Sequence, residues 1–525
     1  MQTLSVVTSE QPAGHRPPGA MPAYAELLSK EPDAAILEAI AWLDALPEGL
    51  TLPIRLEQVL QFEAIVRPQA RRLGNGYLTS PRLGRRQEYH LWQLNNDYWT
   101  RLVNAYENCL DRYAAGEPGA DSLDVALLYA RLLHAYVACH KWARFRYAPI
   151  GSRLWAGSGQ AYLGAVDAGL SGNSLSLFPG AGGNTSTERE YLKLLMLHAS
   201  STDNLLPLEI EIALRLINNF LPHFTFTDEL RHGNVFWVDA AGPLPPTRLA
   251  KRPESSPTLR FFSAGKALKA VAELRRRIEE AGEVPAEVGI GRHCSAASVV
   301  SVLDHLALCW GTMPPARSAP RHPVNSRLVV INGLAEIKLR LAGNGEMPGG
   351  TSEHWVAENV SRDGLGAKRP LAGSDWIRIG ALVGIQPEGG DNWLVGVIRR
   401  FTRESETLSY VGIETVGKAP RLIVAAGSGV SSEATLLDTP HLGDTVSLVL
   451  AHGAFDETVP ITFELDGVKM RLQPLALAET GTDFVRGSYR VEAPEASDAR
   501  PDAGPRPEGA AKQIPLRGSP LGEPD

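Results

Sequence analysis

The feature that most constrains this 525-residue chain is a set of short apolar runs between residues 317 and 413. Clusters rich in Gly, Pro, Asn, Asp and Ser separate the runs, as turns separate antiparallel strands. Many short strands at such spacing favour a small barrel or a sandwich. The predicted strands are 328–330 and 337–341, read as one strand or as two broken near 332–333, followed by 382–385, 393–401 and 408–413.

Two polar signatures flank the first of these strands. Residues 317–321 (RSAPR) have the form RxxxR, and residues 359–364 (NVSRDG) have the form NxSxxG. In this order and around this strand pattern, they resemble the PilZ domain, a bacterial receptor module for cyclic di-GMP. The later segments that fit the same pattern are 380–385, 395–399 and 410–413.

The resemblance implies a six-stranded antiparallel β-barrel over residues 313–420, with cyclic di-GMP as ligand and no further cofactor. The interval between the two signatures is longer than is usual in the family, and we interpret residues 343–352 as an inserted long hairpin loop. Carried over position by position, the cyclic di-GMP-binding residues are Arg317, Arg321, Asn359, Ser361 and Gly364.

These residue types suit such a ligand on chemical grounds. Arginine pairs with phosphate, donates to guanine O6 and N7 or stacks on a purine. Asparagine and serine can read a guanine edge, and glycine permits close approach. Residues 314–403 hold 12 Lys+Arg against 8 Asp+Glu, a net +4 within a chain of formal charge -7. This excess favours a compact anion and is too small for a nucleic acid polymer.

The whole chain is predicted to be a multidomain α+β protein. The C-terminal β-rich part is interpreted as a second small barrel that lacks both signatures, so no second nucleotide site is expected there. The expected parts are a disordered tail (1–22), an all-α helical domain (23–225), a mixed α/β connecting domain (226–312), the PilZ-like barrel (313–420), a further β-rich domain (421–495) and a second disordered tail (496–525).

Hydrophobic periodicity and capping residues predict the individual elements. Helices are expected at 36–46, from 53 onward, at 87–115, from 121 or 122 through 139, and at 153–168, 187–198, 207–220, 264–281 and 295–310. Strands are expected at 234–238, 259–262, 422–425, 446–450, 461–465, 470–472 and 484–486, with Asp466-Gly467 as a hairpin turn.

Three other motifs are given structural interpretations. His305 and Cys309 are four apart and could share a zinc ion, with His293 and Cys294 nearby, but buried thiols and core histidines are commoner, so no metal site is predicted. The glycine-rich residues 180–184 lack the ending of a P-loop and are predicted to form a loop. The basic residues of 141–146 are interpreted as a solvated helix end without a ligand.

The leading functional hypothesis is a cytoplasmic cyclic di-GMP receptor whose helical region relays the signal to a protein partner. The alternative is a non-binding scaffold that mediates protein–protein interaction. An enzyme is not expected, because no nucleophile elbow, HExxH or P-loop occurs. Binding of single-stranded nucleic acid would need a stronger basic groove with aromatic residues. Four cysteines without CxxC spacing and no long apolar run predict a reducing compartment and no membrane insertion.

Overall fold

The computed structural model describes residues 24–80, 84–178, 180, 183–291, 294–314, 319–343, 352–371, 376–405, 407–427 and 430–493. Both predicted tails, and residues 344–351 of the predicted hairpin loop, lie outside these ranges. Within them, no helix is both long enough and apolar enough to cross a membrane.

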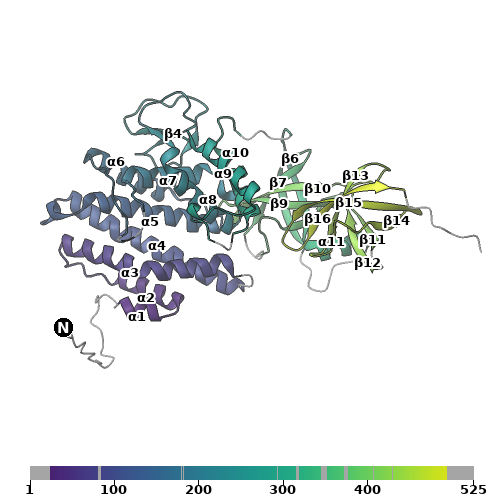
Figure 1. Cartoon of the computed structure of the whole chain (residues 1–525), viewed down its shortest axis with the longest axis horizontal. Coiled ribbons are helices and arrows are strands. Elements are labelled where there is room, and N and C mark those ends of the chain that lie inside the picture. Colours follow the sequence, from purple (N-terminus) through teal and green to yellow (C-terminus); the bar gives the residue numbers. More distant parts are fainter. Residues whose placement is uncertain are drawn as a thin grey trace, which may run out of the picture.

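The first part of the chain is a layered array of helices, which occupies one end of the molecule (Figure 1). The α-helices are α1 Tyr24–Ser29, α2 Pro32–Asp44, α3 Leu52–Thr79, α4 Arg85–Ala114, α5 Val125–Phe145, α6 Ser152–Asp167, α7 Thr187–Ala199, α8 Pro207–Phe220, α9 Ala267–Ala281 and α10 Ala296–Trp310. Single turns of 3-10 helix are η1 Ala120–Ser122, η2 Thr202–Asn204, η3 Leu221–His223 and η4 Ala286–Val288.

Local signals fix where several of these helices begin. The side chain of Asp124 accepts a hydrogen bond of 3.0 Å from a backbone N–H in the first turn of α5, and Ser186 does the same for α7 at 3.2 Å. Pro207 opens α8, where its missing N–H costs no intrahelical bond. These caps satisfy donors that a helix start leaves free.

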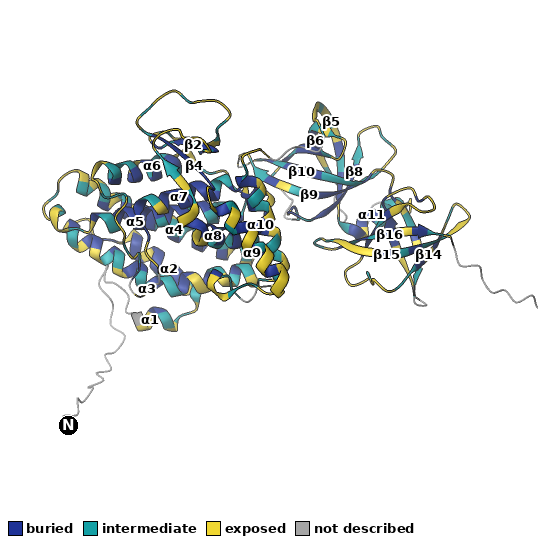
Figure 2. Cartoon of the chain, turned by 45° about the horizontal axis from the view of Figure 1, so that its top comes forward, coloured by how far each residue is buried: buried dark blue, intermediate teal, exposed yellow. Residues whose placement is uncertain are grey.

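A small sheet covers part of the helices, in the order β1-β4-β2-β3. One continuous apolar core runs from Leu27 in α1 to Trp310 in α10 and includes Phe236 and Phe262 of the sheet. Figure 2 shows buried faces throughout α5 and α7 and an exposed outer face on α9. The strands are β1 Thr225–Thr227, β2 Phe236–Asp239, β3 Thr247–Arg248 and β4 Leu259–Ser263.

The rest of the described chain forms two closed six-stranded antiparallel barrels, and the predicted α+β class is therefore confirmed. The first barrel has the order β10-β7-β6-β5-β8-β9 and the second β11-β12-β13-β16-β15-β14. The first comprises β5 His322–Asn332, β6 Glu353–Ser361, β7 Gly364–Pro370, β8 Leu382–Pro387, β9 Leu394–Arg403 and β10 Leu408–Gly417. The second comprises β11 Arg421–Gly427, β12 Val430–Leu436, β13 Thr445–Leu450, β14 Ile461–Leu465, β15 Val468–Thr480 and β16 Val485–Glu492.

The predicted strand at 337–341 is wrong, because these residues belong to helix α11, Gly333–Leu341. Leu334, Ile337 and Leu341 recur at helical spacing, and all three pack in one apolar cluster. Gly333, with φ +85°, makes the sharp turn from β5 into α11. The long interval between the two sequence signatures therefore contains a helix, while β5 and β6 still pair antiparallel.

Helix α11 joins the two barrels. The backbone N–H of Leu334 donates a hydrogen bond of 2.7 Å to the carboxylate of Asp483, which lies just before β16. Lys338 donates one of 2.6 Å to the carbonyl oxygen of Glu433 in β12. The two barrels share a buried cluster that comprises Ile331, Leu334, Ile337, Leu382, Val395 and Val397 from the first and Leu437, Val449 and Phe484 from the second.

Candidate functional site

Strand pairing brings part of the predicted site together. Arg321 immediately precedes β5, and Asn359 lies on β6, where the register pairs it with Pro323. Asn359 also lies opposite Gly366 of β7 on the other side. The antiparallel pairing of β5 with β6 therefore places the end of the RxxxR signature beside the start of the NxSxxG signature.

Arg321 and Asn359 converge on a third residue, the hydroxyl of Tyr410 on β10. Nδ2 of Asn359 donates a hydrogen bond of 3.1 Å to Oη of Tyr410, and Nη1 of Arg321 donates a longer one of 3.4 Å to the same oxygen. Sequence reasoning did not assign Tyr410 to the site. The sequence feature that could have indicated Tyr410 is the alternation of this strand, in which Ser409, Val411 and Ile413 are buried and Tyr410 faces outward.

Gly366 gives the tyrosine hydroxyl room to reach Asn359. A Cβ atom on Gly366 would lie 1.8 Å from Oη of Tyr410 and 2.9 Å from Nδ2 of Asn359. Both distances are shorter than van der Waals contact, so a larger residue would displace one of these groups. Gly366 is thus a second site residue that the sequence signatures did not reveal.

Ser361 and Gly364 lie at the turn between β6 and β7 rather than in the space beside Arg321. Oγ of Ser361 donates a hydrogen bond of 3.1 Å to the carbonyl oxygen of Gly364, and the register pairs the two residues. A Cβ on Gly364 would lie 2.3 Å from the carbonyl oxygen of Ile413, so the turn packs directly on β10. These residues shape the turn that supports Asn359.

An open groove of about 660 Å³ lies beside Arg321 and Asn359. Glu358 also lines the groove, and its carboxylate forms an ion pair of 2.7 Å with Nζ of Lys368. Arg321 has no carboxylate within ion-pair distance among the residues that the structure describes. Arg317 lies outside the described residues. The groove is lined by Arg321, Pro323, Val324, Asn325, Val356, Glu358 and Asn359.

Asn359 retains unused hydrogen-bonding capacity. Its Oδ1 is shielded from solvent and has no hydrogen-bond partner in the described part of the chain. A buried acceptor without a partner costs about 1–3 kcal/mol. A hydrogen-bond donor reaching this amide would relieve that cost, and residues at binding sites commonly carry such a cost.

The residues weighed as metal ligands have other partners. Nε2 of His305 lies 2.7 Å from the carbonyl oxygen of Ser200, and Sγ of Cys309 lies 3.5 Å from the same nitrogen. Burial raises the pKa of Cys309 to about 11, which keeps the thiol protonated. His293 lies outside the described residues, and within them no three His, Cys, Asp or Glu side chains cluster as metal ligands would.

Comparison with known proteins found a match for the helical part of the chain. Residues 22–231 match the family model of the N-terminal domain of the cyclic-di-GMP receptor FimW. No curated protein matches the chain. The matched segment covers α1 to α8 and lies apart from the groove on the first barrel. The match covers less than half of the chain and none of either barrel.

Proposed function

We propose that the first barrel is a PilZ-like domain that binds cyclic di-GMP through Arg317, Arg321, Asn359, Ser361 and Gly364. The observation that carries this proposal is the convergence of Arg321 and Asn359 on the hydroxyl of Tyr410 at an open groove. Two signatures that are distant in sequence thus meet at one surface. The family match of the helical part supports the same ligand by an independent route.

Each groove residue offers a group that the ligand needs. Among the described residues, the guanidinium of Arg321 makes one long hydrogen bond, and its other N–H groups can donate to a phosphate or a guanine edge. Oδ1 of Asn359 is an acceptor that suits a guanine N–H donor. Ser361 and Gly364 support this amide by fixing the turn after β6. Tyr410 acts as a positioning residue, since it holds both polar side chains at the groove.

Binding is relayed to the helical region through the segment between α10 and β5. The sequence of this segment includes Pro314, Pro315 and Pro320, residues that disfavour helix, while Pro323 lies within β5. A ligand held by Arg317 and Arg321 would draw the segment onto the barrel and so bias the orientation of α10. The shift is one of populations, limited by the preference of the ligand for one arrangement. A protein partner of the helical region then receives the signal.

The proposal describes a non-catalytic receptor in the cytoplasm. All four cysteines are free thiols, as a reducing compartment favours. The alternative is a scaffold of PilZ-like shape that binds no nucleotide. Calorimetric titration of the full-length chain with cyclic di-GMP, with GTP as control, distinguishes the two. Saturable binding of cyclic di-GMP but not GTP is expected, and absence of heat at millimolar cyclic di-GMP would leave the scaffold as the better description.

A further inference from the structure

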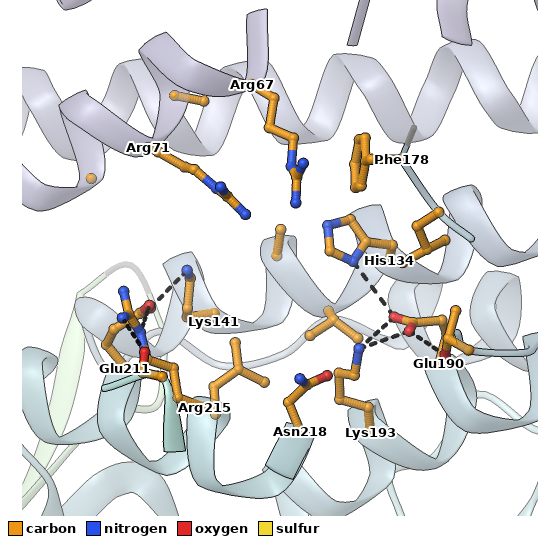
Figure 3. A pocket seen from close by; sticks show the side chains of 18 of the residues that line it. Arg67, Arg71, His134, Lys141, Phe178, Glu190, Lys193, Glu211, Arg215 and Asn218 are labelled. Atoms are coloured by element: carbon orange, nitrogen blue, oxygen red, sulfur yellow. Dashed lines mark hydrogen bonds and ion pairs between the residues drawn. The ribbon is translucent and has the colours of Figure 1, made fainter. Parts of the chain in front are cut away.

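A large cavity of about 1080 Å³ lies inside the helical region, away from the groove on the first barrel. Helix α3 forms one wall, and α4, α5, α7, α8 and residues before α7 form the others; Figure 3 shows lining side chains from α3, α5, α7 and α8. The side chains of Arg67 and Arg71 point from α3 toward Lys141 of α5. The cavity thus gathers cations from separate helices.

The charged residues that line the cavity are mostly basic. Among the described lining residues, six are Lys or Arg and two are Glu, which leaves an excess of four positive charges before histidine is counted. This contrasts with the formal charge of -7 for the whole chain. The eight residues are Arg67, Arg71, Lys141, Arg189, Lys193, Arg215, Glu190 and Glu211.

The two carboxylates are already neutralised by neighbours. Glu211 lies 2.9 Å from both Lys141 and Arg215. Glu190 lies 2.7 Å from Lys193 and 3.5 Å from His134. In each case burial opposes ionisation of the carboxyl group, but the adjacent cations outweigh it and lower the pKa to about 2.

Arg67 and Arg71 are the uncompensated charges. The described part of the chain offers neither side chain a hydrogen bond or an ion pair. The guanidinium carbon of Arg67 lies 3.7 Å from the centre of the Phe178 ring. Burial, together with the charge of Arg71, lowers the pKa of Arg67 to about 10. Two like charges held together in a partly enclosed space repel, and an anion between them would reverse that cost.

The ring of Phe178 stiffens this arrangement without offering a stacking surface. The guanidinium carbon of Arg131 also lies 3.7 Å from the ring centre. Two guanidinium groups at this distance would overlap on one face, so they cover opposite faces. The charge of Arg131 is compensated by a buried ion pair with Glu63, whereas Arg67 has no ion pair with any residue that the structure describes. A ligand is therefore expected to be held by charge and hydrogen bonds at Arg67.

Neutral polar groups complete the cavity. Oδ1 of Asn95, a lining residue that is 1% exposed, has no hydrogen-bond partner within the described residues. The amide of Asn218 on α8 points into the same space (Figure 3). Small-molecule sites are typically pockets of a few hundred to about a thousand Å³ with a few convergent polar groups such as amides and charged side chains.

We propose that this cavity binds a phosphorylated small molecule of nucleotide size, with its phosphate held between Arg67 and Arg71. Guanidinium groups bind phosphate oxygens bidentately, and a pair from one helix can clamp a single phosphate. The neutralised pairs around Glu190 and Glu211 form fixed polar walls, and Asn95 and Asn218 supply hydrogen bonds to the remainder of the ligand. The basic residues of 141–146 are predicted from the sequence to form a solvated helix end. That prediction is wrong for Lys141, which lines this cavity and forms an ion pair with Glu211.

Calorimetric titration of the full-length Arg321→Ala protein, in which the barrel site is impaired, tests the proposal. The probes are pyrophosphate, ATP, GTP and cyclic di-GMP. We expect at least one probe to bind with a Kd below about 1 mM and to bind more weakly as salt is raised. Arg67→Gln and Arg71→Gln are each expected to weaken that binding at least about tenfold, whereas Arg252→Gln, at an exposed position outside the cavity, should leave it unchanged.

Two results would overturn the proposal. One is that none of the four probes reaches this affinity in protein that melts cooperatively. The other is that a probe binds with equal affinity in the parent and in both cavity variants. If Arg67→Gln fails to fold because its stacking on Phe178 is lost, the affinity of Arg71→Gln for the probes tests the proposal by itself. Arg71 is solvent-exposed, and among the described residues it stacks on no aromatic ring.

Discussion

The backbone N–H of Arg403 on β9 donates a hydrogen bond of 3.0 Å to the carbonyl oxygen of Tyr147, which follows α5. Tyr147 adopts a left-handed backbone conformation with φ +54° and packs edge-on against Phe401, with ring centres 5.6 Å apart. Its hydroxyl donates a bond of 3.0 Å to the carbonyl oxygen of Leu205. A residue of the helical region thus lies in the core of the first barrel, so the two parts are joined at a second place besides the segment before β5.

Arg321→Ala is predicted to weaken cyclic di-GMP binding about 10- to 100-fold, because a charge-assisted contact contributes roughly 1.5–3 kcal/mol. Arg327→Ala is the matched control, since Arg327 lies on β5, the strand that Arg321 immediately precedes, has a side chain that is 73% exposed and does not line the groove. Arg399, a later arginine, is a poor control because its side chain forms ion pairs with Glu414 and Glu479. Calorimetry on the three proteins measures the effect. Equal affinity of wild type and Arg321→Ala for cyclic di-GMP would show that Arg321 is not part of the binding site.

Tyr410→Phe is predicted to weaken cyclic di-GMP binding several-fold while leaving the barrel folded. The change removes the hydroxyl to which Arg321 and Asn359 donate, and a neutral hydrogen bond contributes about 1 kcal/mol. Gly366→Ala should have a larger effect, since its Cβ would displace this hydroxyl. Binding titrations paired with thermal melts separate positioning from folding. A loss of stability in Tyr410→Phe as large as its loss of affinity would argue against a positioning role.

The elements with strong local signals could be predicted from the sequence. Helix α8 begins at Pro207 as predicted, and Asp466-Gly467 forms the expected two-residue turn between β14 and β15. The prediction of a strand at 337–341 was wrong because so short an apolar pattern is compatible with either strand or helical periodicity. Packing between the two barrels stabilises the helix. The polar residues of β12 resemble a loop, and only pairing with neighbouring strands makes them a strand.

The site could be predicted only where the signatures themselves carry it. Arg321 and Asn359 are adjacent in space, while the role of Arg317 stays a prediction because it lies outside the described residues. Tyr410 and Gly366 escaped because their roles depend on which strands are neighbours. The cationic cavity escaped for the same reason, since its arginines and lysines come from helices that are distant in sequence.

A fragment of residues 319–493 is predicted to unfold cooperatively and at higher urea than a fragment of residues 319–420. The shorter fragment would expose the cluster that α11 and β8 share with the second barrel, and would lose the Asp483 carboxylate that accepts from the start of α11. In the longer fragment, Phe484→Ala should cost about 3–5 kcal/mol, because Phe484 is fully buried in that cluster. Equal midpoints for the two fragments would show that the first barrel is independent of the second.

The free energy of unfolding of the helical region is predicted to decrease as the pH is lowered below about 6.5. His140 Nε2 lies 3.3 Å from His198 Nδ1, and burial lowers the pKa of His198 to about 3, helped by the charge of Arg144. Burial also lowers the pKa of His140 well below its ordinary value. The unfolded chain therefore binds more protons than the folded chain between these values, so stability is full above 6.5 and is lost toward pH 3.

Urea unfolding of wild type and His198→Gln between about pH 5 and 6.5 isolates this effect, because carboxylates whose pKa burial raises, such as Glu188 and Glu209, contribute equally to both proteins. Each histidine should contribute a slope of about 1.4 kcal/mol per pH unit. His198→Gln should reduce the slope of the unfolding free energy with pH by the contribution of one histidine, whereas His232→Gln, at an exposed position, should leave the slope unchanged. Identical slopes in wild type and His198→Gln would show that this pair does not set the acid sensitivity.

Hydrogen exchange is predicted to reveal the relay in the full-length chain. With saturating cyclic di-GMP, backbone amides of Arg321, His322 and residues 359–364 should gain protection, together with 316–318 beyond the described residues, because the ligand draws the segment before β5 onto the barrel. The amide of Arg403 is the critical reporter, since its bond to Tyr147 joins the helical region to the barrel. If the helical region reorients, the equilibrium of that bond must change and so must the exchange rate of Arg403. Protection confined to 359–364, with Arg403 and the segment before β5 unchanged, would mean that the barrel binds the nucleotide without passing the signal to the helices.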